Sequence, residues 1–426
     1  MKTGRFTGTV LAIGVAASMV LCGCTGSGTT EKESSAEGFT PRLDTEAEVS
    51  LNVVGSYSNF EALEQVIADF NEYYPNVEIT YEEMTSFGDS ILSRCASGSN
   101  VDIIFFAQEW YDGMEELEEN YLEDLDEADI DLSAVTEEVL AQDNVDGKQY
   151  FVPIYLFGAG LIVNTDLLEE YGIDMPTTYD EFLEACEAFS EAGIAPILAH
   201  EDIRGVFFWS NVYDNIYSAD NSEEIVADLN EGKDTYGIFD SCYEDYQELL
   251  ASGYFNAASD EVEDTYESSI LRFLEGDIPF LVGTSDTISG VKKREAKSDT
   301  YTDNPFNYTF ILTPTKSGEN YMAVSANRVA VFKGSENLDY ANEFLRFLVT
   351  GEELATMSNV KGMPTTGADT GDSRFTYLEE QTEGKTIYYS ESGLNIQTCA
   401  AIRWSAYQIP EGEEEASEFF EDYMQK

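Results

Sequence analysis

Residues 147–197 read GKQYFVPIYLFGAGLIVNTDLLEEYGIDMPTTYDEFLEACEAFSEAGIAPI, and this stretch decides the fold. An apolar strand is predicted over Tyr150–Tyr155, followed by a short crossing that contains Gly158 and Gly160. A second strand is predicted over Leu161–Asn164, and two helices come after it. One short passage therefore leaves one sheet and enters another, which is the pattern expected of two lobes joined by a hinge.

The length and composition of the chain set the limits for everything else. With 426 residues, 43% of them hydrophobic, the chain is long enough for two domains with sizeable cores. Its formal net charge is −61. Such a surface repels nucleic acid and anionic lipid headgroups, so we expect neither as a ligand of the folded part.

The first 24 residues are expected to lie outside the fold. Lys2 and Arg5 form a basic start, an apolar run extends over Phe6–Leu21, and Leu21-Cys22-Gly23-Cys24 closes it. This ending resembles the lipobox of bacterial lipoproteins, which implies a signal peptide over 1–23 and a diacylated Cys24. An ordinary cleaved signal with a coincidental cysteine is the alternative. Residues 24–47 are rich in Thr, Ser, Gly and Glu and are predicted to form a flexible tether.

The body of the chain begins with a strand–helix–strand pattern. A strand is predicted over Val49–Val54, a helix that ends before Pro75, and a strand over Val77–Tyr81. A crossover helix predicts parallel neighbouring strands, whose carboxyl edge is where open α/β folds bind ligands. Val101–Phe106 (VDIIFF) is expected to be a central strand buried on both faces.

The remaining elements follow from periodicity. An aromatic-rich helix is expected over Phe207–Tyr217, and Thr178-x-x-Glu181 fits a capping box. We expect a mobile polar segment over 291–304 and a strand pair interrupted at Asn327 and Arg328. The other predicted elements are a helix over 235–255, strands over Ile278–Val282 and Tyr308–Leu312, and a helix over Asp339–Val349.

Five segments in this order and spacing resemble the extracellular solute-binding proteins of bacterial ABC importers, in the sugar-binding, maltose-binding-protein-like group (family 1). The segments are GKQYFVPIYLFGAGLIVNTDLLEEYGIDMPTTYDEF, DIIFFAQEW, FLEGDIPFLVGTSD, ANEFLRFLVTGEE and KGMPTTG. The resemblance implies a type II α/β fold with two lobes, three hinge crossings and a ligand cleft between the lobes. It implies crossings near Ile154–Tyr155, Val282–Thr284 and Arg328–Ala330. The N-terminal lobe would comprise 48–154 plus 285–328, and the C-terminal lobe 155–284 plus 329–426.

The same resemblance implies ligand-binding roles for Phe106, Glu109, Trp110, Phe157 and Asp286, and the chemistry of sugar recognition adds further candidates. Carboxylates and Arg bind sugar hydroxyls, and aromatic faces cover the apolar C–H faces of the ring. At three positions the chain departs from the family: Trp110 replaces an arginine, Phe157 a glutamate, and Asp286 a tryptophan. Several of these residues also have purely structural explanations, such as an ion pair at the hinge for Arg328 or core packing for Trp209. The predicted site comprises Tyr57, Phe106, Glu109, Trp110, Tyr155, Phe157, Trp209, Ser285, Asp286, Arg328, Arg403 and Trp404.

No metal or cofactor is expected. Cys95, Cys186, Cys242 and Cys399 share no CxxC spacing, and the lone His200 cannot complete a zinc set. Buried free thiols are the favoured interpretation of these cysteines, although a disulfide remains open. The sequence also lacks a GxSxG elbow, an HExxH motif and a P-loop, so no enzymatic activity is expected.

The predicted function is a lipid-anchored, monomeric binding protein on the outer face of a bacterial membrane. It would deliver a carbohydrate, most readily an oligosaccharide, to the permease of an ABC importer powered by a separate ATPase. A ligand-sensing lipoprotein and a surface glycoside hydrolase are the alternatives. Suitable carboxylate pairs carry no weight for the hydrolase, because 83 acidic residues guarantee them by chance.

Overall fold

The computed structural model describes most of the chain beyond residue 38. The described residues are 39–56, 61–84, 86–98, 100–107, 114–135, 137–142, 144–145, 147–261, 266–324, 327–366, 387–389, 393–408 and 416–425. Residues Thr40–Lys426 form one compact unit. The predicted signal peptide and residues 24–38 of the predicted tether, Cys24 included, lie outside the described residues, whereas residues 39–47 of that tether are described. None of the helices described is long and apolar enough to cross a membrane.

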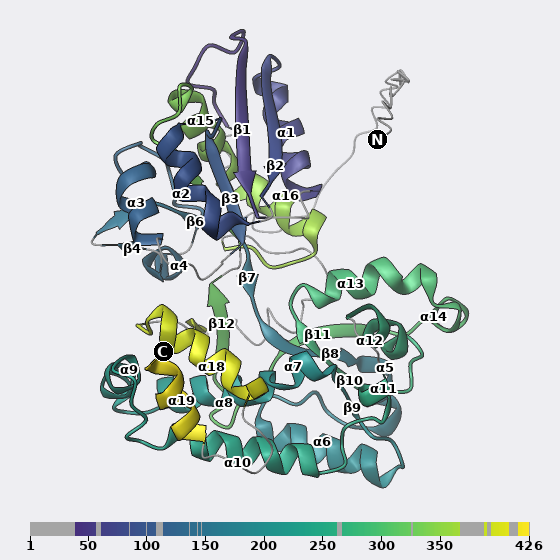
Figure 1. Cartoon of the computed structure of the whole chain (residues 1–426). Coiled ribbons are helices and arrows are strands. Elements are labelled where there is room, and N and C mark those ends of the chain that lie inside the picture. Colours follow the sequence, from purple (N-terminus) through teal and green to yellow (C-terminus); the bar gives the residue numbers. More distant parts are fainter. Residues whose placement is uncertain are drawn as a thin grey trace, which may run out of the picture. The chain divides into compact units, whose positions relative to one another are not determined.

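The first of the larger sheets has five strands in the order β2-β1-β3-β13-β6 (Figure 1). β1 pairs in parallel with β2 and with β3, which confirms the predicted strand–helix–strand unit. β13 lies antiparallel between β3 and β6, although it comes from much later in the chain. The strands are β1 Val49–Gly55, β2 Val77–Glu83, β3 Ile103–Ala107, β6 Val152–Pro153 and β13 Asn327–Val331.

Helices cover this sheet, and we call the sheet with its helices the first lobe. Its central strand is buried on both faces as predicted, since Ile103–Phe106 have no exposed surface. α1 packs against α15 and α16, with the ring of Phe70 edge-on to that of Phe344 at 5.1 Å. The other elements are α1 Glu61–Tyr73, α2 Phe87–Ser97, α3 Met114–Tyr121, α4 Glu137–Gln142, α15 Leu338–Leu348, α16 Gly351–Lys361 and the hairpin of β4 Asn144–Val145 with β5 Lys148–Gln149.

The second of the larger sheets has four strands in the order β11-β8-β10-β9. β8 pairs antiparallel with both β10 and β11. Gly160 is required by this packing, because a Cβ there would lie 1.9 Å from the carbonyl oxygen of Ile311. The glycine therefore serves a close approach of two strands. The strands are β8 Ala159–Asn164, β9 Ile197–Leu198, β10 Phe280–Thr284 and β11 Tyr308–Leu312.

The second sheet and its helices form the second lobe. The capping box of Thr178 and Glu181 at the start of α6 is confirmed, and the aromatic residues of α8 enter the core as expected of an aromatic stripe. The predicted mobile segment 291–304 is wrong, because it forms the end of α13, η1 and α14. The helices are α5 Thr165–Tyr171, α6 Tyr179–Glu191, α7 Glu201–Arg204, α8 Val206–Tyr217, α9 Ser222–Asn230, α10 Ile238–Ala251, α11 Ala258–Glu261, α12 Tyr266–Phe273, α13 Thr287–Arg294, η1 Glu295–Lys297, α14 Asp299–Asp303, α18 Ile396–Gln408 and α19 Ala416–Met424.

A small sheet of β14 (Ile387–Tyr389), β12 (Asn320–Val324) and β7 (Leu156–Phe157) completes the architecture. β12 pairs antiparallel with β7 and parallel with β14. It also packs against α8 of the second lobe.

The structure corrects the expected division of the chain between the lobes. At the first expected crossing, β6 belongs to the five-stranded sheet and β7 to the small sheet, so the chain leaves the first sheet between Pro153 and Leu156. A crossing at Val282–Thr284 is wrong, since β10 and β11 belong to the same sheet. The crossing expected at Arg328–Ala330 instead lies between Val324 and Asn327, and Arg328 is already within β13.

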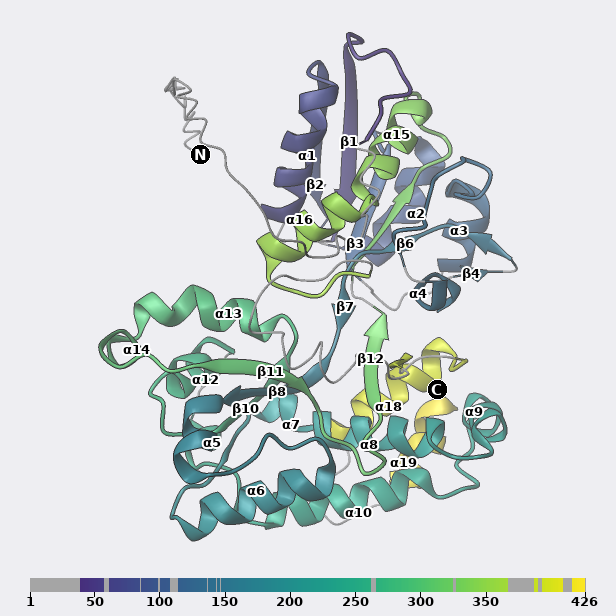
Figure 2. The same cartoon turned by 180° about the vertical axis from the view of Figure 1, so that it is seen from behind.

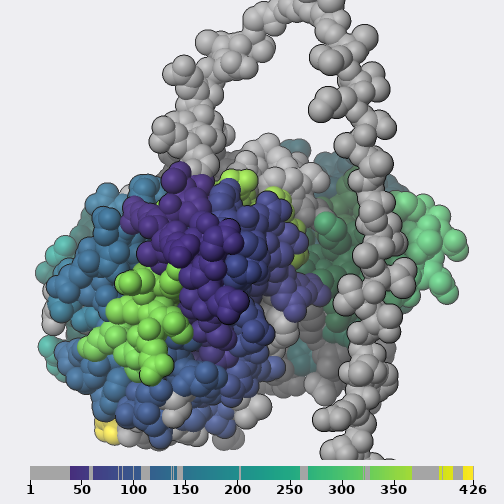
Figure 3. Space-filling view, turned by 90° about the horizontal axis from the view of Figure 1, so that it is seen from above, coloured from purple at the N-terminus to yellow at the C-terminus, as the bar shows by residue number. Residues whose placement is uncertain are grey.

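Residues 285–324 therefore belong to the second lobe and 327–361 to the first, the reverse of the expectation. Figure 3 shows the light-green surface of the 338–361 region set among purple residues from the start of the chain. The error has a physical cause: Tyr308–Leu312 is buried throughout, so its apolar pattern suits a strand of either sheet. The return to the second lobe comes after α16, where β14 pairs with β12.

Candidate functional site

The chain segments that pass between the lobes are hydrogen-bonded to one another. The amide of Leu156 donates to the carbonyl of Pro364 at 2.9 Å, and the amide of Thr366 donates to the carbonyl of Ile154 at 3.0 Å. The amide of Ile154 in turn donates to the carbonyl of Asn327 at 2.8 Å. Tyr155, a predicted ligand residue, forms an isolated bridge with Thr365 and has no exposed surface. The crossings thus form one connected strip of backbone.

Ser285, which follows β10, is hydrogen-bonded to this strip of backbone. Its amide donates to the carbonyl of Gly158 at 2.8 Å, and its hydroxyl donates to the carbonyl of Leu156 at 3.2 Å. The same hydroxyl accepts from the amide of Gly158 at 3.2 Å. The side chain is completely buried. These contacts give Ser285, predicted to bind ligand, a structural role in holding β7 and β10 together.

Asp286 lies immediately before α13, where its carboxylate accepts a hydrogen bond from the hydroxyl of Thr284. Burial lowers the pKa of Lys361 at the end of α16, and the negative charge of Asp286 opposes that shift. Asp286 therefore contributes negative charge where α16 ends and α13 begins.

Two predicted residues of the first lobe lie side by side in its sheet. Phe106 in β3 is opposite Arg328 in β13, and both are buried. The ring of Phe106 stacks on Phe87 at 5.2 Å and meets Phe151 edge-on at 5.4 Å. Phe106 has no exposed surface, so these contacts assign it to the core. The predicted residues Tyr57, Glu109 and Trp110 lie outside the described residues.

The other predicted residues gather on the second lobe. Trp209 is in α8, and Arg403 and Trp404 are in α18, which packs on α8. Phe157 in β7 pairs with Ala323 of β12, the strand beside α8. Figures 1 and 2 show α8, α18 and β12 next to one another from opposite sides. We call the surface formed by α8, α18, β7 and β12 the α8–α18 surface.

Two buried hydrogen-bond donors of this surface have no acceptor among the described residues. Trp209 is only 9% exposed, and its indole N–H has no hydrogen-bond acceptor among the described residues. The side-chain amide nitrogen of Asn211 is likewise buried and has no acceptor in the described part of the chain. Buried donors normally have a partner, so each is a candidate donor to a bound molecule. Trp404, by contrast, exposes half of its surface. A buried donor and an exposed ring on adjoining helices suit a ligand with both hydroxyl groups and apolar faces.

Asp214, which the sequence analysis did not single out, fixes β12 against α8. Its carboxylate accepts from the hydroxyl of Tyr321 at 3.0 Å, from the amide of Ser317 at 3.0 Å and from the Ser317 hydroxyl. Burial, together with the charge of Asp214 and its hydrogen bond, raises the pKa of Tyr321. The signal was present in the sequence, since Asn211 and Asp214 interrupt an otherwise aromatic helix.

Outside this surface, residues of the segment 126–140 and Gln149 of the first lobe line an open surface pocket of about 620 Å³. None of the predicted site residues lines it. Within the described residues, no group of three or more His, Cys, Asp or Glu side chains is arranged to hold a metal ion. Cys95, Cys186, Cys242 and Cys399 are free and buried, as favoured from the sequence, and burial raises the pKa of the Cys95 thiol to about 12.

The two larger sheets, the small sheet and their crossings define a two-lobe α/β fold, and comparison with solved structures agrees. RafE from Streptococcus pneumoniae in its apo form superposes with a TM-score of 0.68 at 16% identity, over 91% of this chain and 99% of that chain. The GacH receptor of Streptomyces glaucescens, solved unliganded and with acarbose, gives 0.67 at 16% identity, over 89% and 97%. A sugar transporter from Bacillus licheniformis in complex with stachyose gives 0.65 at 18% identity, over 88% and 98%.

The family follows from the sequence itself. The model of the bacterial extracellular solute-binding proteins matches residues 55–353, which is more than half of the chain. The chain belongs to this family.

Proposed function

We propose that the protein is a lipid-anchored binding protein that captures a carbohydrate, most readily an oligosaccharide, and delivers it to an ABC importer. Three considerations support the proposal. The family is one of extracellular solute-binding proteins. Similar structures were solved with raffinose, stachyose and acarbose. The α8–α18 surface pairs an indole donor that lacks an acceptor among the described residues with a half-exposed ring.

The proposed site draws on both lobes. On the second lobe, Trp209 donates a hydrogen bond to a sugar hydroxyl, while Trp404 and Phe157 cover apolar ring faces and Arg403 donates to further hydroxyls. On the first lobe, Arg328 is the corresponding donor, and Glu109 and Trp110, which follow β3 in the sequence, bind further groups of the sugar. The observation that carries this site is the indole of Trp209, which is buried without an acceptor in the described residues.

A thermal-shift screen across mono- and oligosaccharides tests the ligand class. A ligand that binds only the folded state raises Tm as its concentration increases. We expect such a rise for at least one oligosaccharide. No shift with any sugar, together with a shift for peptides, polyamines or metal ions, would contradict carbohydrate capture, and turnover of a glycoside would contradict a purely binding role.

The site is tested by Trp209→Phe, which keeps a buried aromatic ring and removes the donor. Loss of one hydrogen bond to the ligand is expected to weaken binding by roughly five- to ten-fold, as measured by calorimetry with the sugar found in the screen. Tyr236→Phe is the control, because Tyr236 is an exposed aromatic residue of the same lobe that bonds Glu224. Equal affinity of both variants and the parent protein would remove Trp209 from the site.

The anchor is tested by labelling cells with radioactive palmitate. The resemblance to a lipobox implies acylation at Cys24, two residues beyond Cys22. Cys24→Ser is expected to abolish labelling, and Cys22→Ser is expected to retain it. Labelling that survives Cys24→Ser would contradict anchoring at this residue.

A further inference from the structure

The segment Thr40–Asp44, which precedes the first strand, lies along the first lobe in an ordered conformation. Side chains alternate between half-buried and exposed from Pro41 to Val49, with the odd-numbered positions turned inward. The compact unit of the structure begins at Thr40. The segment is therefore part of the folded body, and its predicted assignment to the tether is wrong.

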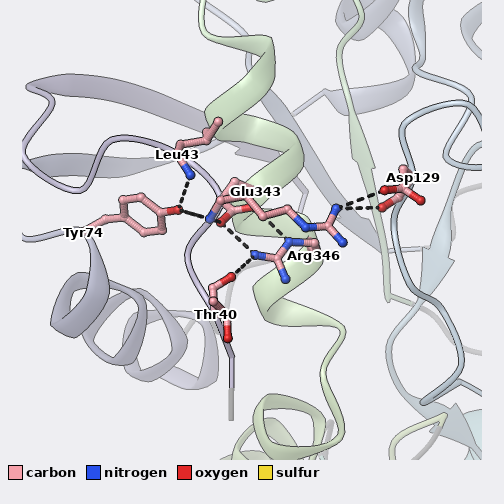
Figure 4. Close-up of polar contacts among 7 residues, drawn as sticks. Thr40, Leu43, Tyr74, Asp129, Glu343 and Arg346 are labelled. Atoms are coloured by element: carbon pink, nitrogen blue, oxygen red, sulfur yellow. Dashed lines mark hydrogen bonds and ion pairs between the residues drawn. The ribbon is translucent and has the colours of Figure 1, made fainter. Parts of the chain in front are cut away.

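A cluster of polar side chains on the first lobe forms hydrogen bonds with the backbone of this segment (Figure 4). The amides of Arg42 and Leu43 both donate to the hydroxyl of Tyr74, each at 3.2 Å. The amide of Arg42 also donates to Oε1 of Glu343 at 2.8 Å. The guanidinium of Arg346 donates to the carbonyl of Thr40 at 2.8 Å. Two successive amides and a carbonyl of the segment are thus bound by three side chains.

The receiving side chains are themselves held in place. Tyr74 donates its hydroxyl proton to Oε1 of Glu343 at 2.5 Å, and Arg346 donates to both oxygens of Glu343 at 2.8 Å. Tyr74 is completely buried, Glu343 is 4% exposed, and the Arg346 side chain is 13% exposed. The ring of Tyr74 stacks on Phe70 at 4.8 Å. A buried charge pair therefore faces the backbone of the segment and is hydrogen-bonded to it.

Further bonds fix the part of the segment that leads into β1. The hydroxyl of Tyr340 donates to the carbonyl of Asp44 at 2.9 Å. Asp44 closes a turn, since its carbonyl accepts from the amide of Ala47 and its carboxylate from the amide of Glu46. The attachment thus continues from Thr40 to β1 along the helix α15 that carries Tyr340, Glu343 and Arg346.

We propose that Thr40–Asp44 is a docked strap that fixes the exit of the N-terminal chain on the first lobe. The significance of that exit rests on the proposed lipid anchor. The anchor would then hold the first lobe, and the sixteen residues Cys24–Phe39 would separate it from the strap. Sixteen residues reach at most about 55 Å when fully extended. Release of the strap as far as Glu48 adds nine residues and about 30 Å to that reach. The strap therefore sets how far from the membrane the binding protein stands.

Trypsin cleavage of the Arg42–Leu43 bond measures docking directly. A protease needs an extended, accessible segment, so cleavage proceeds only from the undocked state. Tyr74→Phe keeps the buried ring and removes the hydroxyl that accepts from both amides. We expect cleavage after Arg42, followed by mass spectrometry of the full chain, to be slow in the parent protein and about ten-fold faster or more in Tyr74→Phe.

Tyr308→Phe is the matched control, because it removes a similar bond, from a buried tyrosine to Glu295 at 2.6 Å, in the second lobe. Hydrogen exchange at the amides of Arg42 and Leu43 is the second measurement and should be accelerated only in Tyr74→Phe. Rapid cleavage after Arg42 in the parent protein, or equal rates in all three proteins, would overturn the strap. Neither measurement involves lipid, so failure of the strap and failure of palmitate labelling at Cys24 are distinct results.

Discussion

Two glutamates on successive helices of the first lobe are buried to the same extent but differ in their hydrogen-bond partners. Glu343 in α15 and Glu353 in α16 are each 4% exposed. Glu343 accepts hydrogen bonds from Arg346, Tyr74 and the Arg42 amide. Oε2 of Glu353 is buried with no hydrogen-bond partner among the described residues.

The surroundings shift the two pKa values in opposite directions. Burial alone would raise the pKa of Glu343, but the bonds from Arg346, Tyr74 and Arg42 outweigh it and lower that pKa. Burial raises the pKa of Glu353 to about 8, and the nearby charges of Asp69 and Glu352 add to the effect. The difference teaches that partners, rather than depth, decide whether a buried carboxyl is charged.

The largest effect is expected from Glu343→Ala. The substitution leaves Arg346 and Tyr74 buried around a missing carboxylate, and breaking a buried ion pair in this way costs about 3–5 kcal/mol. Urea denaturation at pH 7 should therefore show a clear fall in the free energy of unfolding. The contribution of Glu343 is present above its unfolded pKa near 4.5 and is lost as the pH falls through its lower folded pKa. A loss below 1 kcal/mol would show that the pair contributes little.

An intermediate effect of the opposite sign is expected from Glu353→Gln. The native state binds the proton more tightly than the unfolded chain, so this carboxyl makes stability fall as the pH rises from 4.5 to about 8. At pH 9 the variant should be more stable than the parent protein by roughly 2–4 kcal/mol, because a neutral amide replaces a buried charge. Below pH 4.5 the two proteins should be nearly equal. Denaturation curves at pH 4, 7 and 9 decide the matter, and a variant that loses stability at pH 9 would contradict the assignment.

The smallest effect is expected from Arg42→Ala. The Arg42 side chain pairs with Asp129 at 3.3 Å, but Asp129 is almost fully exposed, and such surface pairs contribute at most about 1 kcal/mol. The strap is bound through the amide of Arg42, which the substitution retains. A change in Tm as large as that of Glu343→Ala would mean that the side chain, and not the backbone, carries the docking.

The sequence predicted the elements of the fold better than their assignment to lobes. Strands such as Tyr308–Leu312 matched almost residue for residue, because their apolar runs are short and bounded by polar residues. Pairing between distant strands has no local signal, so β13 was not expected between β3 and β6. The family resemblance supplied the two-lobe architecture and the first crossing, but a strand buried on both faces fits either sheet equally well.

Only part of the candidate site could be predicted from the sequence. The predicted site residues Phe106, Tyr155 and Ser285 prove to be completely buried. The type of a residue and its position in a motif do not reveal whether the residue is buried. The hydrogen bonds of Ser285 join it to backbone more than a hundred positions earlier in the sequence, which no local pattern predicts. Asn211 and Asp214 were missed because polar residues within an aromatic helix were treated as part of its core pattern.

The position of β13 determines when each sheet can be completed as the chain emerges from synthesis. β6 joins the five-stranded sheet only through β13, which ends at Val331. The four-stranded sheet has all its strands once Leu312 has been made. The lobe that begins first in the sequence is therefore the later one to complete its sheet, and such distant pairing slows folding.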